Sequence, residues 1–274
     1  MPDQRVLITG SAGVVGTLMR SRLSRPGRVL RLLDLAEQRG AEDGEAVEIV
    51  TGSVTDPEAM AAACAGADAL IHLGGLSREA SWADTLDVNI NGTHTVLEAA
   101  REAGIRRVVL ASSNHAVGFR RNDEGGPDGH PADSSARPDT YYGVSKAAIE
   151  ALGSLYASRF GMDVIVIRIG SCFETPLPLG PRGLSTWLSP DDGARLFEAC
   201  LSAPSPGYRM IWGVSDNTRR VYSLAEAEAL GYQSEDNAEV YAEQLADKPM
   251  PTGIAGEHLG GPFCTAPLGV FNPL

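Results

Sequence analysis

Tyr142 and Lys146 are the two residues whose types and spacing could carry acid–base chemistry. Side chains four positions apart lie on one face of a helix, so a helix here would hold them close together. A tyrosine with its ordinary pKa of about 10 is a poor base at pH 7, and we expect the lysine ammonium to favour the phenolate and lower that pKa. Such a pair could remove a proton from a sugar or alcohol hydroxyl. Because the same spacing occurs by chance in surface helices, the rest of the chain must decide.

A glycine-rich turn near the N-terminus favours the binding of a dinucleotide. The apolar run 5–8 predicts a buried strand, and it leads into residues 9–16 (TGSAGVVG), where Gly10, Gly13 and Gly16 are spaced GxxGxxG. The first glycine would allow a tight turn, the second would let the backbone approach a pyrophosphate, and the third would let the following helix pack on the strand. The N–H groups at the start of that helix would bind the phosphates.

An acidic residue after the second predicted strand favours NAD over NADP. The strand covers residues 29–33, and Asp34 follows it, 18 residues beyond Gly16. A carboxylate at this position can bind the adenosine ribose hydroxyls and repels a 2′-phosphate. The alternative interpretation of Asp34 is a loop acid or a helix cap.

Strands and helices alternate along the chain, which predicts an α/β fold with a Rossmann-type, doubly wound parallel sheet. We expect one domain over residues 1–274, with residues 1–170 mainly the NAD-binding core and residues 171–274 mainly a small C-terminal substrate-binding portion. Further strands are expected at residues 46–50, 67–73, 107–111, 163–169 and 208–212, and helices at residues 83–103 and from about Asp56, Asp139 and Ser189.

Composition excludes several classes of function. The net charge of −12 over 274 residues argues against a nucleic-acid-binding protein, which needs a basic face. The four cysteines form no CxxC pair, so we expect no metal site. No apolar run approaches the roughly 20 residues that span a membrane, and the N-terminus has no charged-then-apolar leader. We therefore expect a cytoplasmic chain with no membrane partner.

Small and polar residues follow two of the predicted strands. Ser112, Ser113, Asn114 and His115 end the fifth strand, and a loop rich in glycine and proline leads from them to the Tyr142 helix. Open α/β sheets bind ligands at the carboxyl ends of their strands, so this cluster should line a site. The glycine pair at residues 74–75, after the fourth strand, should lie beside the cofactor.

These motifs together resemble the extended short-chain dehydrogenase/reductase superfamily, which contains the NAD-dependent epimerases and dehydratases. A more specific set resembles its uronate dehydrogenases, namely HLGGLS (72–77), SSNH (112–115), YGVSK (142–146), RIGSC (168–172) and LSTW (184–187). The resemblance implies NAD-dependent oxidation of the C1 hemiacetal hydroxyl of a hexuronate, such as D-glucuronate or D-galacturonate, to the aldarolactone. It also implies a homo-oligomer.

The resemblance assigns roles to individual residues. Tyr142 would be the proton acceptor, Lys146 would bind the nicotinamide ribose, and Ser113 would orient the reacting oxygen. The sugar contacts would be Ser77, Ser113, Asn114, His115, Ser171 and Arg182, with the arginine gripping the carboxylate through paired hydrogen bonds. The cofactor contacts would be Gly10, Gly13, Val14, Val15, Gly16, Asp34, Leu35, Ser53, Val54, Leu73, Gly74, Gly75, Ser77, Asn89, Tyr142, Lys146 and Cys172.

Other interpretations remain open. Ser112 could serve only to satisfy backbone groups, His115 could be structural, and Arg182 could be a surface residue, while Arg168 favours a structural role. The loops at 120–139 and 176–183 look long for the family. The rival enzymes are a sugar-nucleotide epimerase or another sugar dehydrogenase, although the short C-terminal part leaves little room for a nucleotide. A rival of another class is a non-catalytic, NAD-sensing regulator.

Overall fold

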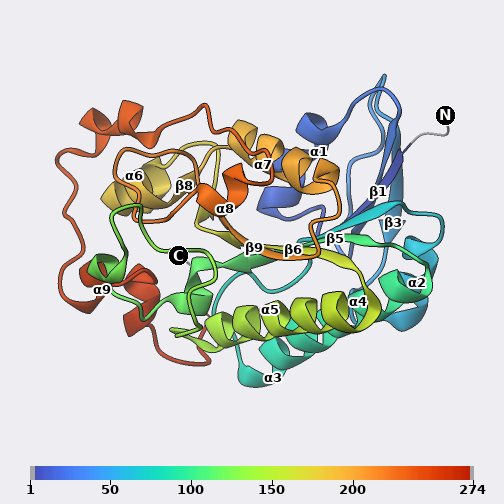
Figure 1. Ribbon diagram of the computed structural model, residues 1–274, viewed down its shortest axis with the longest axis horizontal. Coiled ribbons are helices and arrows are strands. Elements are labelled where there is room, and N and C mark those ends of the chain that lie inside the picture. The colour runs from blue at the N-terminus through green and yellow to red at the C-terminus, as the bar shows by residue number, and fades with distance from the viewer. Residues whose placement is uncertain (1–3, 272–274) are drawn as a thin grey trace.

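The structure is a computed structural model that describes residues 4–271. Within these residues, seven parallel strands form the main sheet, in the order β3-β2-β1-β4-β5-β6-β9 (Figure 1). The strands are β1 (Gln4–Thr9), β2 (Arg28–Asp34), β3 (Val47–Thr51), β4 (Ala69–His72), β5 (Arg107–Ser113), β6 (Asp163–Ile169) and β9 (Tyr208–Gly213). The predicted Rossmann-type sheet is confirmed.

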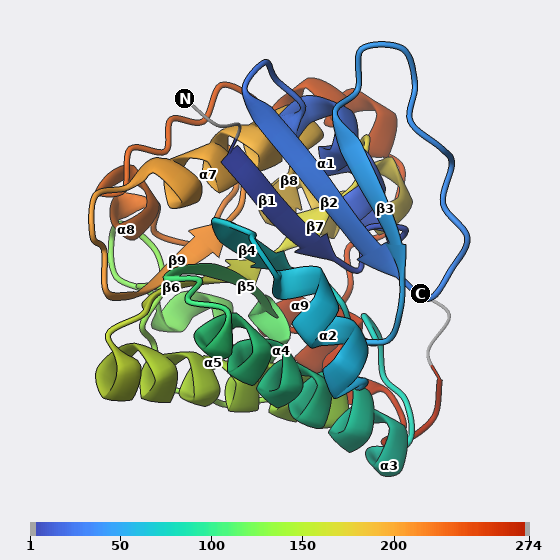
Figure 2. The ribbon, with the colours of Figure 1, turned by 90° about the vertical axis from the view of Figure 1, so that its right-hand side faces the viewer.

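The strands are apolar because helices cover both faces of the sheet. The side chains of Val6, Leu7 and Ile8 in β1 are fully buried, as expected for a central parallel strand. One face is covered by α1 (Val14–Leu23) and α7 (Pro190–Ser202). The other face is covered by α2 (Pro57–Cys64), α4 (Gly92–Glu102) and α5 (Tyr141–Phe160), as Figure 2 shows. Packing between the sheet and these helices holds in place the strand ends that carry the predicted site residues.

The strand order reverses between β1 and β4. The chain moves outward from β1 to β2 and β3 on one side, and β4 begins the other side. Thr9 pairs with His72 at the carboxyl ends of these two strands. The glycine turn after β1 and the glycine pair after β4 therefore lie side by side, at the crevice where doubly wound sheets bind ligands.

The helix expected over residues 83–103 is not a single regular α-helix. It consists of α3 (Trp82–Asp84), a π-helical segment η1 (Thr85–Asn91) and α4. The wider π turn ends at Asn89–Asn91, where the Asn89 side chain reaches out of the helix to the loop after β4. Such segments often occur at functional sites, and a periodicity of apolar residues does not reveal them.

From Ser223 to Phe271 the chain is made of short elements. The helices there are α8 (Ala225–Glu228) and α9 (Ile254–Glu257), and the 3-10 turns are η5 (Ala238–Tyr241), η6 (Glu243–Leu245) and η7 (Gly261–Thr265). Leu259 N donates to Arg120 O and Gly260 N donates to Gly118 O, both at 2.9 Å. These bonds bring residues 258–269, which we call the C-terminal segment, to the carboxyl edge of the sheet.

Across residues 4–271, the helices fall short of the length and apolarity that a bilayer crossing demands. The single domain at 1–274 stays a prediction, and the ends of that range, 1–3 and 272–274, lie outside the described residues.

Candidate active site

Two glycines of the first turn are required by close packing. Gly10 has a φ of +70°, and a Cβ on it would lie 2.5 Å from Gly74 N. A Cβ on Gly16 would lie 2.6 Å from Gly10 O. Any larger residue would therefore push the turn away from β4 or the helix away from the turn.

The start of α1 fits an anionic group. Gly13 is its N-cap residue, and none of the side chains in residues 4–271 caps it. The N–H groups of the first turn are thus open to a phosphate. Val14 follows and is 55% exposed, so it can contact a ligand. These features fit the pyrophosphate of a dinucleotide.

Asp34 ends β2 and holds the glycine turn. Its Oδ2 accepts a hydrogen bond from Ala12 N at 2.9 Å, and its Oδ1 accepts one from Ala36 N at 3.0 Å. The carboxylate is therefore fixed at the strand end rather than mobile in a loop. Leu35 beside it is exposed.

The predicted cofactor contacts after β3 and after β4 lie against each other. A Cβ on Gly74 would lie 2.7 Å from Val54 Cγ1, so the two strand ends touch. Ser53 bonds with Thr55 through their hydroxyls at 2.8 Å, and Leu73 N donates to Thr9 O at 3.0 Å.

Asn89, predicted to contact the cofactor, is engaged by protein groups. Its Oδ1 accepts from Leu76 N at 2.7 Å, and its Nδ2 donates to Leu76 O at 3.0 Å and to Ser145 Oγ at 2.9 Å. The amide therefore ties the loop after β4 to α5. Gly75 allows this contact, because a Cβ there would lie 2.9 Å from Asn89 Oδ1.

Tyr142 and Lys146 lie on the first two turns of α5, which Thr140 caps by accepting a hydrogen bond from Gly143 N at 3.1 Å. Tyr142 is 7% exposed and Lys146 is 9% exposed. The Lys146 Nζ donates to Ala111 O at 2.7 Å and lies 5.5 Å from the centroid of the Tyr142 ring. The predicted helix has brought the two side chains together at the end of β5.

Burial dominates the titration of both groups. It raises the pKa of Tyr142 to about 12, although a hydrogen bond from the Ser113 side chain opposes the shift. It lowers the pKa of Lys146 to about 8, although the Glu150 carboxylate opposes that shift. The expectation of a lowered Tyr142 pKa is therefore wrong for the protein groups alone, because desolvation of the phenolate and the nearby Asp139 carboxylate both raise it.

The SSNH segment connects Tyr142 to the C-terminal segment. Ser113 ends β5, and its Oγ donates to Asn114 Oδ1 and accepts from His115 N, both at 3.3 Å. Its side chain lies close enough to Tyr142 to oppose the rise in the pKa of the tyrosine. Asn114 is fully buried, and its Nδ2 donates to Leu259 O at 2.8 Å.

His115 lies between charged and aromatic partners. Its Nδ1 is 2.6 Å from Asp139 Oδ2. Its ring is edge-on to Tyr142 at 5.7 Å between centroids and stacks on Phe263 at 4.0 Å. Neither the Asp139 pairing nor Phe263 was predicted from the sequence. Asp139 carried a signal, since it lies directly before the cap of α5, whereas Phe263 carried none.

Arg182 ends η4 (Leu177–Arg182) and is partly buried rather than a free surface residue. Its Nη2 donates to Leu259 O at 2.5 Å, the same oxygen that accepts from Asn114. Its Nε and Nη1 atoms have no hydrogen-bond partner among residues 4–271. The guanidinium therefore keeps free donors beside the SSNH segment.

The RIGSC and LSTW motifs pair with each other. β7 (Ser171–Cys172) and β8 (Trp187–Leu188) form a small parallel ladder in which Ser171 faces Trp187. Ser171 accepts from Thr186 Oγ1 at 3.2 Å. Cys172 is buried, and burial raises the pKa of its thiol to about 12, so the reactive thiolate is disfavoured near neutral pH. Ser77 is exposed on the loop after β4.

A buried ion pair lies one helical turn beyond Lys146. Arg168 Nε and Nη2 each donate to the Glu150 carboxylate at 2.8 Å, which confirms a structural role for Arg168. Ser112 Oγ donates to the same carboxylate at 2.6 Å. The suggestion that Ser112 satisfies backbone groups is wrong, because its partner is a side chain.

Glu79 is a further residue that sequence reasoning missed. Its carboxylate is 0% exposed, accepts from Tyr142 N at 2.9 Å and accepts from Gly269 N at 2.7 Å. It therefore ties the loop after β4 both to α5 and to the C-terminal segment.

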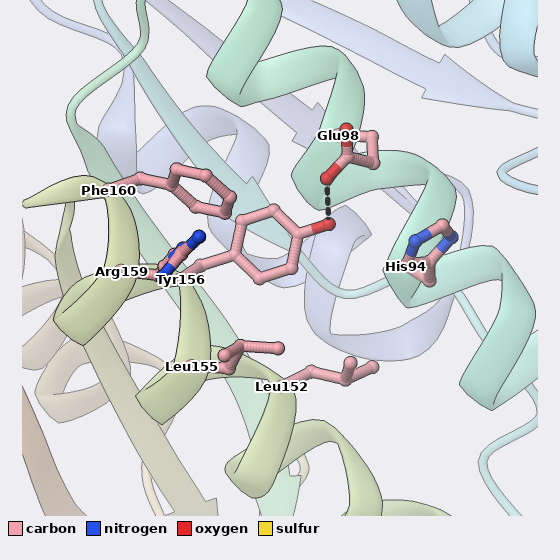
Figure 3. Close-up of a pocket in the computed structure, with 7 residues that line it drawn as sticks. All are labelled: His94, Glu98, Leu152, Leu155, Tyr156, Arg159 and Phe160. Atoms are coloured by element: carbon pink, nitrogen blue, oxygen red, sulfur yellow. Dashed lines mark hydrogen bonds between the residues drawn. The ribbon is translucent and has the colours of Figure 1, made fainter.

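A separate groove lies between α4 and the C-terminal half of α5, away from Tyr142 on the first turn. Figure 3 shows Tyr156 hydrogen-bonded to Glu98 across it, with His94 at its edge. The lining residues are His94, Glu98, Leu152, Leu155, Tyr156, Arg159 and Phe160. No predicted site residue lines the groove.

The chain is similar to known enzymes over nearly its whole length. Residues 6–174 match the NAD dependent epimerase/dehydratase family. A uronate dehydrogenase of Pseudomonas syringae pv. tomato is 39% identical over 271 residues, which cover 98% of this chain and 96% of that protein. An NAD-dependent glucose-6-phosphate dehydrogenase of Haloferax volcanii is 37% identical over 250 residues, which cover 86% of this chain and 95% of that protein. The crystal structure of a mutant uronate dehydrogenase from Agrobacterium tumefaciens complexed with NAD matches with a TM-score of 0.89 and 37% identity, covering 96% and 98%.

Proposed function

Because the chain belongs to the NAD dependent epimerase/dehydratase family and, within it, to the uronate dehydrogenases, we propose that it oxidises the C1 hemiacetal hydroxyl of a hexuronate with NAD. D-glucuronate and D-galacturonate are the proposed substrates, and the aldarolactone is the product. Membership of the family makes the chain an NAD-dependent oxidoreductase. The roles of the individual residues are proposals.

One observation carries the choice of a sugar acid. Leu259 O accepts hydrogen bonds from both Asn114 and Arg182, so the guanidinium is held next to the segment that leads to Tyr142. Nη2 gives one of its two hydrogens to Leu259 O, and Nε and Nη1 have no partner in residues 4–271. Arg182 can therefore donate two parallel hydrogen bonds to a carboxylate from Nη2 together with Nε or Nη1. In a pyranose hexuronate the carboxylate is attached to C5, which is joined to C1 through the ring oxygen, so Arg182 could hold the carboxylate while Tyr142 acts at C1.

The proposed chemistry needs only side chains already described. Tyr142, as the phenolate, takes the proton from the C1 hydroxyl, and Ser113 donates a hydrogen bond to the same oxygen. The O–H electron pair then forms the C1 carbonyl as a hydride leaves C1, which gives the lactone. NAD, when bound, accepts that hydride. The chain positions the reacting groups and excludes water around Tyr142.

The same reasoning proposes where the dinucleotide lies. Gly10, Gly13 and Gly16 and the open start of α1 would hold the pyrophosphate, and Asp34 would hold the adenosine ribose. The remaining proposed contacts are Val14, Val15, Leu35, Ser53, Val54, Leu73, Gly74, Gly75, Ser77, Asn89 and Cys172. Asn89 would act through the loop it holds, because its amide already has three protein partners.

Assembly and location are also proposed from the resemblance. We propose a homo-oligomer, which size-exclusion chromatography with light scattering would test. The cysteines at 64, 172, 200 and 264 are unpaired in the described residues, in keeping with a reducing compartment such as the cytoplasm.

A screen of NADH formation tests the function. The purified chain would be assayed with D-glucuronate, D-galacturonate, neutral aldoses, glucose 6-phosphate and UDP-sugars, with NAD and NADP compared. Rapid turnover of a free uronate with NAD is expected. Equal turnover of neutral aldoses would contradict the role of Arg182, and turnover of UDP-sugars alone would favour the epimerase-type rival. NAD binding without any turnover would favour a sensor.

A further inference from the structure

Asp139 has a buried carboxylate whose two oxygens have different partners. Its Oδ2 lies 2.6 Å from His115 Nδ1, and its Oδ1 accepts a hydrogen bond from Thr140 Oγ1 at 2.9 Å. The side chain has no exposed surface. A buried carboxylate is costly unless it is hydrogen-bonded, so the pairing with His115 is not an incidental surface contact.

Three glycines from three segments make room for this carboxylate. A Cβ on Gly118 or on Gly260 would lie 2.0 Å from Asp139 Oδ2, and a Cβ on Gly143 would lie 2.8 Å from Oδ1. Gly118 follows the SSNH turn, Gly143 is in α5, and Gly260 is in the C-terminal segment. The carboxylate is therefore enclosed at the point where these three segments meet, and it has little freedom to move.

The two nitrogens of His115 are in different situations. Nδ1 faces Asp139, whereas Nε2 has no hydrogen-bond partner among residues 4–271. The side chain remains 12% exposed, while Phe263 covers one ring face and Tyr142 lies at the edge. Nε2 is thus the nitrogen that can meet a ligand beside Tyr142.

A carboxylate only accepts hydrogen bonds, so its partner on Nδ1 must carry a hydrogen. We propose that Asp139 is a positioning residue that fixes neutral His115 as the Nδ1–H tautomer, which leaves Nε2 to accept a hydrogen bond from a sugar hydroxyl next to the reacting carbon. The identity of the ligand as a sugar rests on the proposed function. The tautomer itself rests on the Asp139 contact alone.

The proposal has a consequence for selectivity. With Nε2 as an acceptor, the protein binds a substrate that has a hydroxyl at this position more tightly than one that lacks it. If Asp139 did not fix the ring, the Nε2–H tautomer could form and the same nitrogen would become a donor. The hydroxyl would then have to turn its oxygen toward His115, in competition with the other donors around the site.

The test combines spectroscopy with kinetics. Solid-state 15N spectra of histidine-labelled protein with NAD at pH 8 would report the His115 tautomer, with the signal assigned by a His115→Gln variant. We expect a protonated Nδ1 and an unprotonated Nε2. Asp139→Asn should mix the tautomers and raise the KM for the uronate about 10-fold or more, as the loss of one good hydrogen bond predicts. Its affinity for NAD should change less than about twofold, and kcat should fall less than KM rises.

Asp192→Asn is the matched control, because Asp192 is an equally buried acid that caps the turn at residues 234–236. It should lower stability without changing the His115 signal or the KM. A wild-type spectrum with the hydrogen on Nε2 would overturn the proposal, and so would an unchanged KM in folded Asp139→Asn. If Asp139→Asn does not fold, the wild-type spectrum still shows which nitrogen of His115 carries the hydrogen. Failure of every uronate to react would contradict the proposed function instead, and would leave the tautomer result unaffected.

Discussion

Lys146 Nζ lies 5.5 Å from the centroid of the Tyr142 ring, yet its hydrogen bond goes to Ala111 O at 2.7 Å. Within residues 4–271, the ammonium is therefore close to the phenol ring but hydrogen-bonds a backbone carbonyl instead of the phenol oxygen. Burial favours the neutral form of both groups, because it raises the pKa of Tyr142 to about 12 and lowers that of Lys146 to about 8. The base form of Tyr142 must gain stabilisation from the bound reactants as well as from the lysine.

Replacement of Tyr142 by phenylalanine should abolish turnover and leave NAD binding intact. The ring keeps its contacts with His115 and Lys146, while the proton acceptor is lost, so kcat should fall by roughly 10²- to 10⁴-fold, the usual contribution of a general base. Steady-state kinetics and titration of NAD binding by calorimetry would measure the two effects.

Tyr141→Phe is the control for this change, because Tyr141 is the adjacent residue and packs on Trp82 at 5.4 Å instead. It should keep kcat near the wild-type value. Near-normal turnover in Tyr142→Phe would remove the tyrosine from the mechanism.

Lys146→Met should make the protein inactive but more stable near neutral pH. The folded-state pKa of about 8 lies below the ordinary value of 10.5, so the unfolded chain binds more protons between these pH values and the wild type gains stability as pH rises through them. Burial of the charged lysine lowers the free energy of unfolding of the wild type by an amount on the order of 3 kcal/mol at pH 7. The variant avoids this cost, but it also loses the hydrogen bond to Ala111 O. The excess stability of Lys146→Met over the wild type should shrink between pH 8 and pH 10.5, and urea unfolding at several pH values would measure it.

The pKa can also be read directly, because Lys146 and Lys248 are the only two lysines of the sequence. Lysine-selective 15N labelling would give two signals, and Lys248→Arg would assign them. A Lys146 signal that does not titrate until pH 10 would contradict both the burial penalty and the predicted stability change.

Arg182→Ala should mainly weaken the binding of the uronate. Loss of a charge-assisted hydrogen bond costs about 1.5–3 kcal/mol, so KM should rise by roughly 10- to 150-fold with a smaller change in kcat. Arg182→Lys keeps the charge but not the planar pair of donors, so it should restore only part of the affinity.

Arg25→Ala provides the matched control, since Arg25 precedes β2 at the opposite, amino end of the sheet and pairs with Glu198 there. It should leave KM unchanged. If Arg182→Ala oxidises uronates with the parent KM, the carboxylate is bound elsewhere.

The parts of the fold set by local pattern could be predicted from the sequence. Buried parallel strands are continuous apolar runs, so β6 (Asp163–Ile169) was predicted to the residue, and the Asp56 and Ser189 caps followed from Ser/Asp–Pro chemistry. The position of Tyr142 and Lys146 also followed, because helical spacing is local.

The contacts that complete the site are not local. Asn114 meets Leu259 across 145 positions, and Glu79 meets Gly269 across 190. Nothing in the composition of the C-terminal segment indicates that it returns to the end of β5. The prediction for the pKa of Tyr142 was wrong for a related reason. The spacing of Tyr142 and Lys146 is visible in the sequence, but the burial of Tyr142 depends on all the segments that meet around it.

Asp34→Ala should shift the cofactor preference toward NADP. The carboxylate is held at the end of β2 by Ala12 N and Ala36 N, and removing it takes away the group that would repel a 2′-phosphate. We expect kcat/KM with NAD to fall roughly 10-fold or more, from the loss of a charged hydrogen bond, while kcat/KM with NADP holds or rises. The ratio of the two constants, measured at saturating uronate, is the readout. An unchanged ratio would place the adenosine ribose away from Asp34.

Glu79→Gln should loosen the C-terminal segment and with it the sugar site. The carboxylate accepts from Tyr142 N and Gly269 N, but a glutamine has one acceptor oxygen, and its amide group would face the second N–H. One buried N–H then loses its partner, at a cost of about 1–3 kcal/mol.

Hydrogen–deuterium exchange should accelerate at residues 258–269, and KM for the uronate should rise more than KM for NAD, because Phe263 and Leu259 lie in that segment. Glu58→Gln on the exposed first turn of α2 is the control and should change neither. Unaltered exchange across residues 258–269 in a folded Glu79→Gln variant would show that the segment is held in place without this carboxylate.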